Sequence, residues 1–156
     1  YLNRPQIVTR IASNQMAFAE FDQWGGDLND NVTRVLAANL SSLLKTDRVS
    51  LYPWKNEAPI EEQVTIDVVN FEQDVDGSSL LTAYWSIVDP RKSEVKLMRR
   101  STYRNAGGTT LSATGSAGAS QKESSRFYDA IVAAMSRNLE TLSRDIADAV
   151  ARLKAK

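Results

Sequence analysis

The fold class is decided by residues 27–54, which read DLNDNVTRVLAANLSSLLKTDRVSLYPW. In the first part of this stretch apolar side chains recur three or four positions apart, which is typical of a helix with one apolar face. These positions are Val32, Val35, Leu36, Leu40, Leu43 and Leu44. Asp27 or Asn29 can cap the first turn. A short Lys-Thr-Asp connection then leads to a predicted strand over residues 49–52, which ends at Pro53.

The apolar face of this helix needs a sheet to cover, and the remaining sequence predicts one. Runs rich in β-branched or alternating apolar residues indicate five further strands, over residues 6–11, 16–21, 63–73, 81–87 and 94–103. Within residues 63–73 the alternation slips at Val69 and Phe71, which indicates either a β-bulge or burial on both faces. A hairpin turn is predicted at residues 74–77, and the alternation around Trp85 places that side chain in the core.

A second amphipathic helix is predicted over residues 124–153. Its apolar positions are Phe127, Ile131, Met135, Leu139, Leu142, Ile146, Val150 and Leu153. We expect Leu139 and Leu142 to pack on the sheet. The helix is about 45 Å long at about 1.5 Å per residue, longer than a small sheet requires, so its far end can meet a partner. Residues 106–121 are rich in Gly, Ser, Thr and Ala without periodicity, which predicts a mobile loop.

The short connections between most of the predicted strands favour antiparallel pairing. The sequence therefore predicts an α+β fold with a mostly antiparallel sheet of about five to six strands and two helices packed on one face. A chain of 156 residues is long enough to bury a core of its own, so we expect residues 1–156 to form a single domain.

Composition excludes several classes of function. Lysine and arginine together number 19, the same as aspartate and glutamate, whereas nucleic-acid surfaces usually carry a basic excess. The chain has no histidine and no cysteine, which removes the commonest general base, the thiol nucleophile and the commonest metal ligands. We therefore predict a protein that is not an enzyme and that needs no cofactor, metal or nucleic acid.

Two motifs resemble ligand-binding loops without completing them. Asp74, Asp76 and Gly77 suggest part of a calcium loop, but if Glu72 is the first ligand, the twelfth position holds Ala83 in place of glutamate. The glycines of residues 107–118 precede a helix, but no Gly-Lys-Ser/Thr sequence follows them. A solvated hairpin turn and a flexible loop are the favoured interpretations.

Arginine and tryptophan side chains give a less decisive signal. Arg99, Arg100 and Arg104 can bind an anionic group, although a charged edge strand that resists aggregation is the favoured explanation. Trp24 and Trp54 follow loop signals, so they can either line a ligand pocket or simply pack locally.

Taken together, four segments resemble the ABC-type transport auxiliary lipoproteins of the paraquat-inducible (PqiC/YmbA-like) type. They are YLNRPQIVTR at residues 1–10, RVLAANL at 34–40, RVSLYPW at 48–54 and LSRDI at 142–146. The resemblance covers nearly the whole chain in the same order. The family's usual Arg-Trp-Ala-Glu-like segment is here QWGG at residues 23–26.

The resemblance implies a lipoprotein on the periplasmic face of the outer membrane of a Gram-negative bacterium. Its signal peptide and lipidated cysteine are expected upstream of Tyr1. It also implies partnership with an MCE-domain protein and inner-membrane permease subunits in a lipid transport system that supports membrane integrity, and homo-oligomers are plausible. A stand-alone periplasmic module that binds lipid or another small molecule is the alternative.

We expect the partner to be bound by residues of the resembling segments and of the loop tryptophans, since buried arginine and aromatic side chains supply much interface energy. The predicted partner-binding residues are Arg4, Gln6, Arg10, Trp24 and Trp54. The competing interpretation is that residues 4–10 are only the first strand.

Overall fold

The computed structural model describes residues 6–12, 15–23, 28–54, 59–74, 76–107 and 121–156. Its strands are β1 (Gln6–Ala12), β2 (Gln15–Gln23), β3 (Gln63–Gln73), β4 (Ser79–Asp89) and β5 (Glu94–Asn105). Its helices are α1 (Leu28–Leu43) and α2 (Gln121–Lys154). Arg4, Trp24 and nearly all of the loop predicted to be mobile lie outside the described residues.

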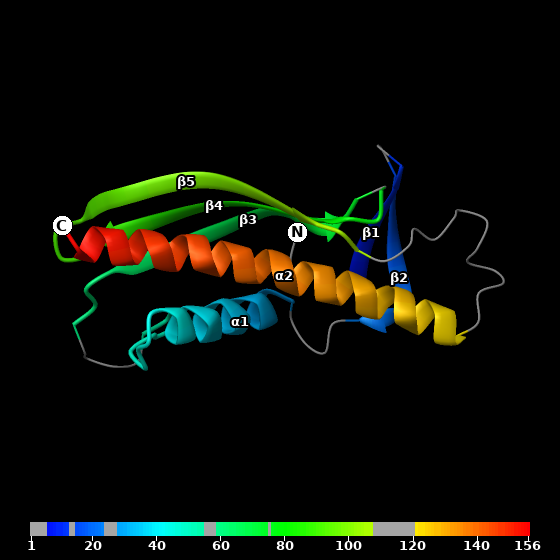
Figure 1. Cartoon of the computed structure of the whole chain (residues 1–156), viewed down its shortest axis with the longest axis horizontal. Helices are drawn as coiled ribbons and strands as arrows, with labels where there is room; N and C mark the ends of the chain where they lie inside the picture. Colours follow the sequence, from blue (N-terminus) through cyan, green and yellow to red (C-terminus); the bar gives the residue numbers. More distant parts are fainter. Residues whose placement is uncertain (1–5, 13–14, 24–27, 55–58, 75, 108–120) are drawn as a thin grey trace.

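The strands follow the order β2-β1-β3-β4-β5 in the sheet. Neighbouring strands β3, β4 and β5 pair antiparallel over most of their length. β1 and β2 form their own antiparallel pair, and β1 meets β3 in parallel through Thr9 and Gln73. Figure 1 shows β1 and β2 at one end of the molecule, steeply inclined to the three long strands. The α+β class, the two helices and the antiparallel pairing of β3, β4 and β5 are confirmed.

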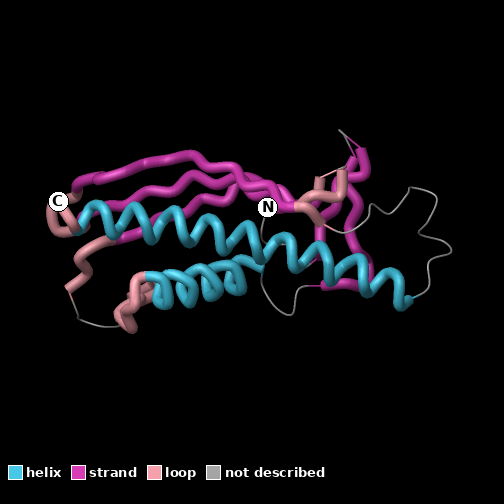
Figure 2. The backbone as a smooth tube through the Cα atoms, in the orientation of Figure 1, coloured by secondary structure: helices cyan, strands magenta, loops and turns pink. Residues whose placement is uncertain are grey.

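The two helices lie on the same side of the long strands, but they differ in what they contact (Figure 2). α2 packs against β4 and β5, whereas α1 packs mainly against α2. α2 is 34 residues long, about 51 Å at about 1.5 Å per residue, and it extends past the end of the long strands (Figure 1). Leu139 and Leu142 are buried as predicted, at 6% and 0% exposure.

The strand predicted over residues 49–52 is wrong, because this segment is an irregular loop. α1 ends in a Schellman motif, in which Lys45 has a positive φ of 51° and the Thr46 amide donates to the Ser41 carbonyl. The chain leaves this motif with Leu51 and Tyr52 exposed at 43% and 80%. A β-branched run becomes a strand only beside a pairing edge, and among the described strands none pairs with this segment.

The slipped alternation of β3 is a β-bulge. The register between β3 and β4 shifts between Val68 and Asn70, so Val69 is 40% exposed while Phe71 is 3% exposed. The extra residue returns Phe71 to the face that contacts the helices. Trp85 of β4 lies in the core at 1% exposure, as predicted, and its indole N–H donates to Ser101 Oγ at 3.0 Å.

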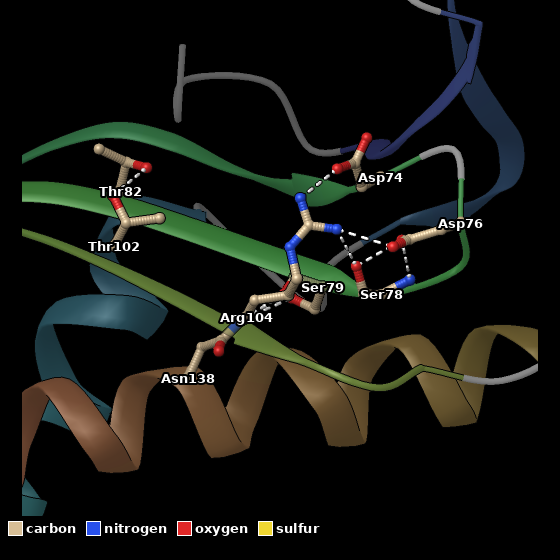
Figure 3. Close-up of polar contacts among 8 residues, drawn as sticks. All are labelled: Asp74, Asp76, Ser78, Ser79, Thr82, Thr102, Arg104 and Asn138. Carbon is tan, nitrogen blue, oxygen red and sulfur yellow. Dashed lines mark hydrogen bonds and ion pairs between the residues drawn. The ribbon is translucent and has the colours of Figure 1, made fainter.

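An arginine from β5 holds the turn between β3 and β4 (Figure 3). Arg104 donates to Asp74 Oδ2 at 2.6 Å, to Asp76 Oδ2 at 2.8 Å and to Ser78 Oγ at 2.8 Å. Gly77 has φ of 81°, and its amide donates to the Asp74 carbonyl at 3.0 Å. The two aspartates that suggested a calcium loop therefore both pair with one arginine side chain of the protein.

A buried polar network joins α2 to the sheet. Asn138 is fully buried, and its Nδ2 donates to the carbonyl and the hydroxyl of Ser79 at 3.0 and 2.9 Å (Figure 3). Its Oδ1 accepts from Asn105 at 2.6 Å. Farther along α2, Ser143 accepts a hydrogen bond from Asn39 of α1 at 3.2 Å. Because unpaired buried amides are costly, these bonds fix the position of α2 along the sheet.

We expect the ion pairs of the β3–β4 turn to make stability depend on pH. Hydrogen bonds from Ser78, and then the charge of Arg104, hold the pKa of Asp76 below its usual value of 3.8. Such a carboxylate stabilises the fold above its unfolded pKa, and this contribution is lost as the pH falls through the lower folded pKa. Asp76→Asn should therefore lower the free energy of unfolding at neutral pH and flatten its pH dependence below about pH 4.

Urea melts at several pH values would check this prediction. Asp148→Asn, at an exposed position of α2, is the control for removing one carboxylate. Identical pH dependence in the two variants would show that the turn does not couple protonation to folding.

Candidate functional site

The helix-facing side of the sheet is covered unequally. On β4, Ala83, Trp85 and Ile87 are at most 1% exposed. The side chains beside them on β3, Val64, Ile66 and Val68, are only half-buried. This difference arises because α2 covers β4 and β5, while α1 packs mainly on α2 and leaves part of β3 open.

The space between α1 and β3 forms a groove of about 830 Å³. Its apolar lining is contributed by α1, β3, the loop after α1 and the C-terminal part of α2. The apolar side chains are Val32, Leu36, Ala37, Leu40, Leu44, Val49, Leu51, Tyr52, Trp54, Pro59, Ile60, Val64, Ile66, Val68 and Val150. Polar and charged side chains share the lining with these apolar ones, and a groove of this volume and mixed lining fits an amphiphilic molecule.

An aromatic pair stands at the loop side of this groove. The rings of Tyr52 and Trp54 meet edge to face, with centroids 5.3 Å apart. Trp54 is 37% exposed and Tyr52 is 80% exposed, so both rings can contact a further molecule. Trp54 is one of the two tryptophans predicted from the sequence as pocket or partner residues, and it lines this groove.

Glu62 brings a buried carboxylate to the same groove. Its side chain is 10% exposed, and its Oε1 accepts a hydrogen bond from Lys96 at 3.2 Å. None of the described residues donates a hydrogen bond to its Oε2. The neighbouring Glu61 is 65% exposed and pairs with Lys154 at 3.6 Å. The two adjacent glutamates therefore lie in opposed environments, one buried and one exposed.

Sequence reasoning missed Glu62 as a site residue, because its isolation depends on the tertiary structure. Lys96 lies 3.9 Å from Asp89 Oδ2 as well, so one ammonium is shared by two carboxylates. Asp89 also pairs with Arg91, which lowers the pKa of Asp89 mainly through their hydrogen bond. No pattern in the sequence identifies a carboxylate oxygen that is left without a donor after folding.

The arginines of β5 are used within the sheet. Arg99 lies over the Trp85 ring at 6.0 Å and Arg100 lies over the Tyr84 ring at 5.8 Å. Tyr103 donates to Asp145 of α2 at 2.7 Å, and burial, followed by this carboxylate, raises the pKa of Tyr103 to about 12. β5 is an edge strand of the described sheet, which agrees with the favoured interpretation of its arginines.

The predicted partner-binding residues do not gather in one place. Gln6 and Arg10 lie on β1, opposite Gln23 and Met16 of β2. Trp54 lies in the loop after α1, and α1 ends on the side of the molecule away from β1 and β2 (Figure 1). Arg4 and Trp24 lie outside the described residues.

Within the described part of the chain, no group of three or more acidic residues is arranged to hold a metal ion. None of the described helices combines the length and the hydropathy needed to cross a membrane. The groove between α1 and β3 is the candidate functional site, because it combines an apolar wall with the buried carboxylate of Glu62.

Solved structures show the same fold. An uncharacterised protein superposes with a TM-score of 0.74 at 19% identity, over 96% of this chain and 84% of its own. A Xanthomonas campestris protein of the DUF330 family gives a TM-score of 0.71 at 15% identity, over 94% and 74%. A candidate lipoprotein from Caulobacter crescentus gives 0.50 at 12%, over 78% and 82%. No curated protein sequence matches this chain significantly.

The family model of the ABC-type transport auxiliary lipoprotein component matches residues 1–147. This match spans β1 to most of α2, and so includes the groove-lining segments of α1 and β3. The description is that of a transport component and not of a class of enzyme. The chain therefore belongs to the ABC-type transport auxiliary lipoprotein family.

Proposed function

We propose that this protein is a non-enzymatic outer-membrane lipoprotein subunit of an ABC/MCE-type system that moves lipids across the envelope and supports membrane integrity. The observation that carries the proposal is the family match over residues 1–147. The partners are an MCE-domain periplasmic protein and inner-membrane permease subunits, and the protein faces the periplasm.

Two features of the molecule support a role in association. α2 extends past the long strands, so its first turns lie beyond the part of the helix that packs on β4 and β5 (Figure 1). The β1–β2 pair is joined to the rest of the sheet through Thr9 and Gln73, so it forms a separate ribbon at one end of the molecule. We propose Arg4, Gln6, Arg10, Trp24 and Trp54 as partner-binding residues, and several copies around one elongated partner as the assembly.

Co-purification from membranes tests this function. The lipidated wild-type protein should bring down an MCE-domain protein. At least one of the variants Arg4→Ala, Arg10→Ala and Trp24→Ala should reduce the recovered complex about ten-fold, as loss of an interface hot spot does. Arg152→Ala, an exposed position near the end of α2, is the control, and each variant must melt as the wild type does.

Two results would count against the proposal. If all three folded variants recover as much complex as the wild type, the proposed residues do not form the interface. Failure of the lipidated wild type to bring down any MCE-domain protein would remove the subunit role itself.

The groove favours a second candidate, a periplasmic lipid- or small-molecule-binding module that works alone. An apolar groove of about 830 Å³ can hold a ligand without any partner protein. Purification of a stable monomer with bound lipid and without an MCE-domain protein would support this candidate over the first.

A further inference from the structure

The charges that line the groove between α1 and β3 are unbalanced. Among the described residues its lining includes the four carboxylates of Asp47, Glu61, Glu62 and Asp67, against the two cations of Arg48 and Lys154. When Lys96 is also counted, because it pairs with Glu62 from outside the lining, one carboxylate is in excess, which favours a ligand that carries a cation.

The carboxylate of Glu62 identifies the kind of cation. Its side chain is nine-tenths buried, with Oε1 bonded to Lys96 and Oε2 without a donor among the described residues. A buried oxygen in this state gains most from a donor that is itself charged. A primary ammonium supplies such a donor, whereas a trimethylammonium has the same charge and no N–H.

Arg48 supplies a cation to the same groove. It lines the groove and is exposed, and no described carboxylate lies within ion-pair distance of its guanidinium. Arginine binds phosphate oxygens through two parallel N–H groups. The groove therefore offers an aliphatic lining, an acceptor for an ammonium and a free guanidinium for a phosphate.

We propose that the groove binds an acyl chain of a phospholipid with an ethanolamine head group, whose ammonium donates to Glu62 Oε2 and whose phosphate contacts Arg48. The choice of a lipid among amphiphiles rests on the proposed function. The apolar wall of α1 and β3 holds the chain, and Trp54 lies against it at the loop side of the groove.

Tryptophan quenching by lysophospholipids with a brominated chain, below their micelle concentrations, tests this site in the isolated protein. Three head groups are compared: ethanolamine, choline and glycerol. The wild type should bind the ethanolamine lipid about ten-fold more tightly than the choline lipid, as one hydrogen bond between charged groups predicts. The glycerol lipid should bind most weakly. Trp54→Phe should remove most of the quenching, although Trp24 and Trp85 remain.

The variants separate the head-group contact from the chain contact. Glu62→Gln should abolish the preference for ethanolamine over choline, and Glu140→Gln, which alters an exposed glutamate outside the groove, should keep it. Val64→Phe should weaken all three lipids, because the larger side chain narrows the groove without adding a tryptophan. Equal wild-type affinity for the ethanolamine and choline lipids would overturn the head-group assignment. Quenching that persists unchanged in Trp54→Phe would overturn the groove as the site.

This test is independent of the partner. If the protein binds the ethanolamine lipid but brings down no MCE-domain protein, the proposed lipid site is supported and the proposed subunit role is rejected. If the protein brings down the partner but its tryptophan fluorescence is not quenched by the lipids, the subunit role is supported and the proposed lipid site is rejected.

Discussion

Trp85→Ala is expected to lower the free energy of unfolding by about 3–5 kcal/mol, as removal of a fully buried aromatic side chain does. Trp85 is 1% exposed, and it lies beside Ile66 of β3 and Arg99 of β5 in the register of the sheet. Alanine would leave a cavity at the centre of the three long strands and remove the donor to Ser101. Because small domains are stable by only about 5–15 kcal/mol, urea melts should detect the loss easily.

Trp85→Phe separates the contribution of the buried ring from that of the hydrogen bond to Ser101. Phenylalanine keeps most of the buried ring but cannot donate to Ser101 Oγ, so we expect a loss of about 1 kcal/mol beyond the change in volume. Equal melts for Trp85→Ala and the wild type would mean that this side chain does not lie in the core.

Leu142→Ala should be the second most destabilising of the proposed changes, at about 2–5 kcal/mol. Leu142 is fully buried in the cluster that α2 shares with β4 and α1. Loss of its side chain leaves a cavity in the layer between helix and sheet, where packing density allows little relaxation.

Leu43→Ala is the matched control, because Leu43 is a helical leucine that is 42% exposed. It should change stability by about 0.5 kcal/mol or less, as surface substitutions do. The outcome that contradicts our description of the core is a loss of the same size in both variants.

The apolar stripe of α2 and the alternation around Trp85 could be interpreted from the sequence with little error. Both patterns continue over many residues. A repeat that continues over many residues specifies which side of a helix or strand is buried, whatever element covers that side. α1 was predicted less fully: Val35 and Leu43 belong to its apolar stripe, yet they are 40% and 42% exposed. One packed neighbour covers a narrower strip of a helix than the sequence pattern suggests.

The site was predicted only in part. Trp54 was selected because it follows a loop signal, and it lines the groove. Glu62 was not selected, since the sequence places Lys96 34 residues away and does not show that Lys96 contacts Glu62 and Asp89 together. A local sequence pattern shows which residues are polar, but it does not show which of their atoms lack a hydrogen-bond partner after folding.

By itself the sequence determined the two helices, the antiparallel strands β3, β4 and β5, and the family, because each depends on local periodicity or on short motifs. Tertiary structure alone decided that residues 49–52 form a loop, since a strand requires an edge to pair with. It also decided that α1 packs mainly on α2 and leaves Val64, Ile66 and Val68 half-covered. The groove exists for that reason. Amphipathic periodicity determines which face of α1 is buried, but the folded structure determines whether α2 or the sheet covers that face.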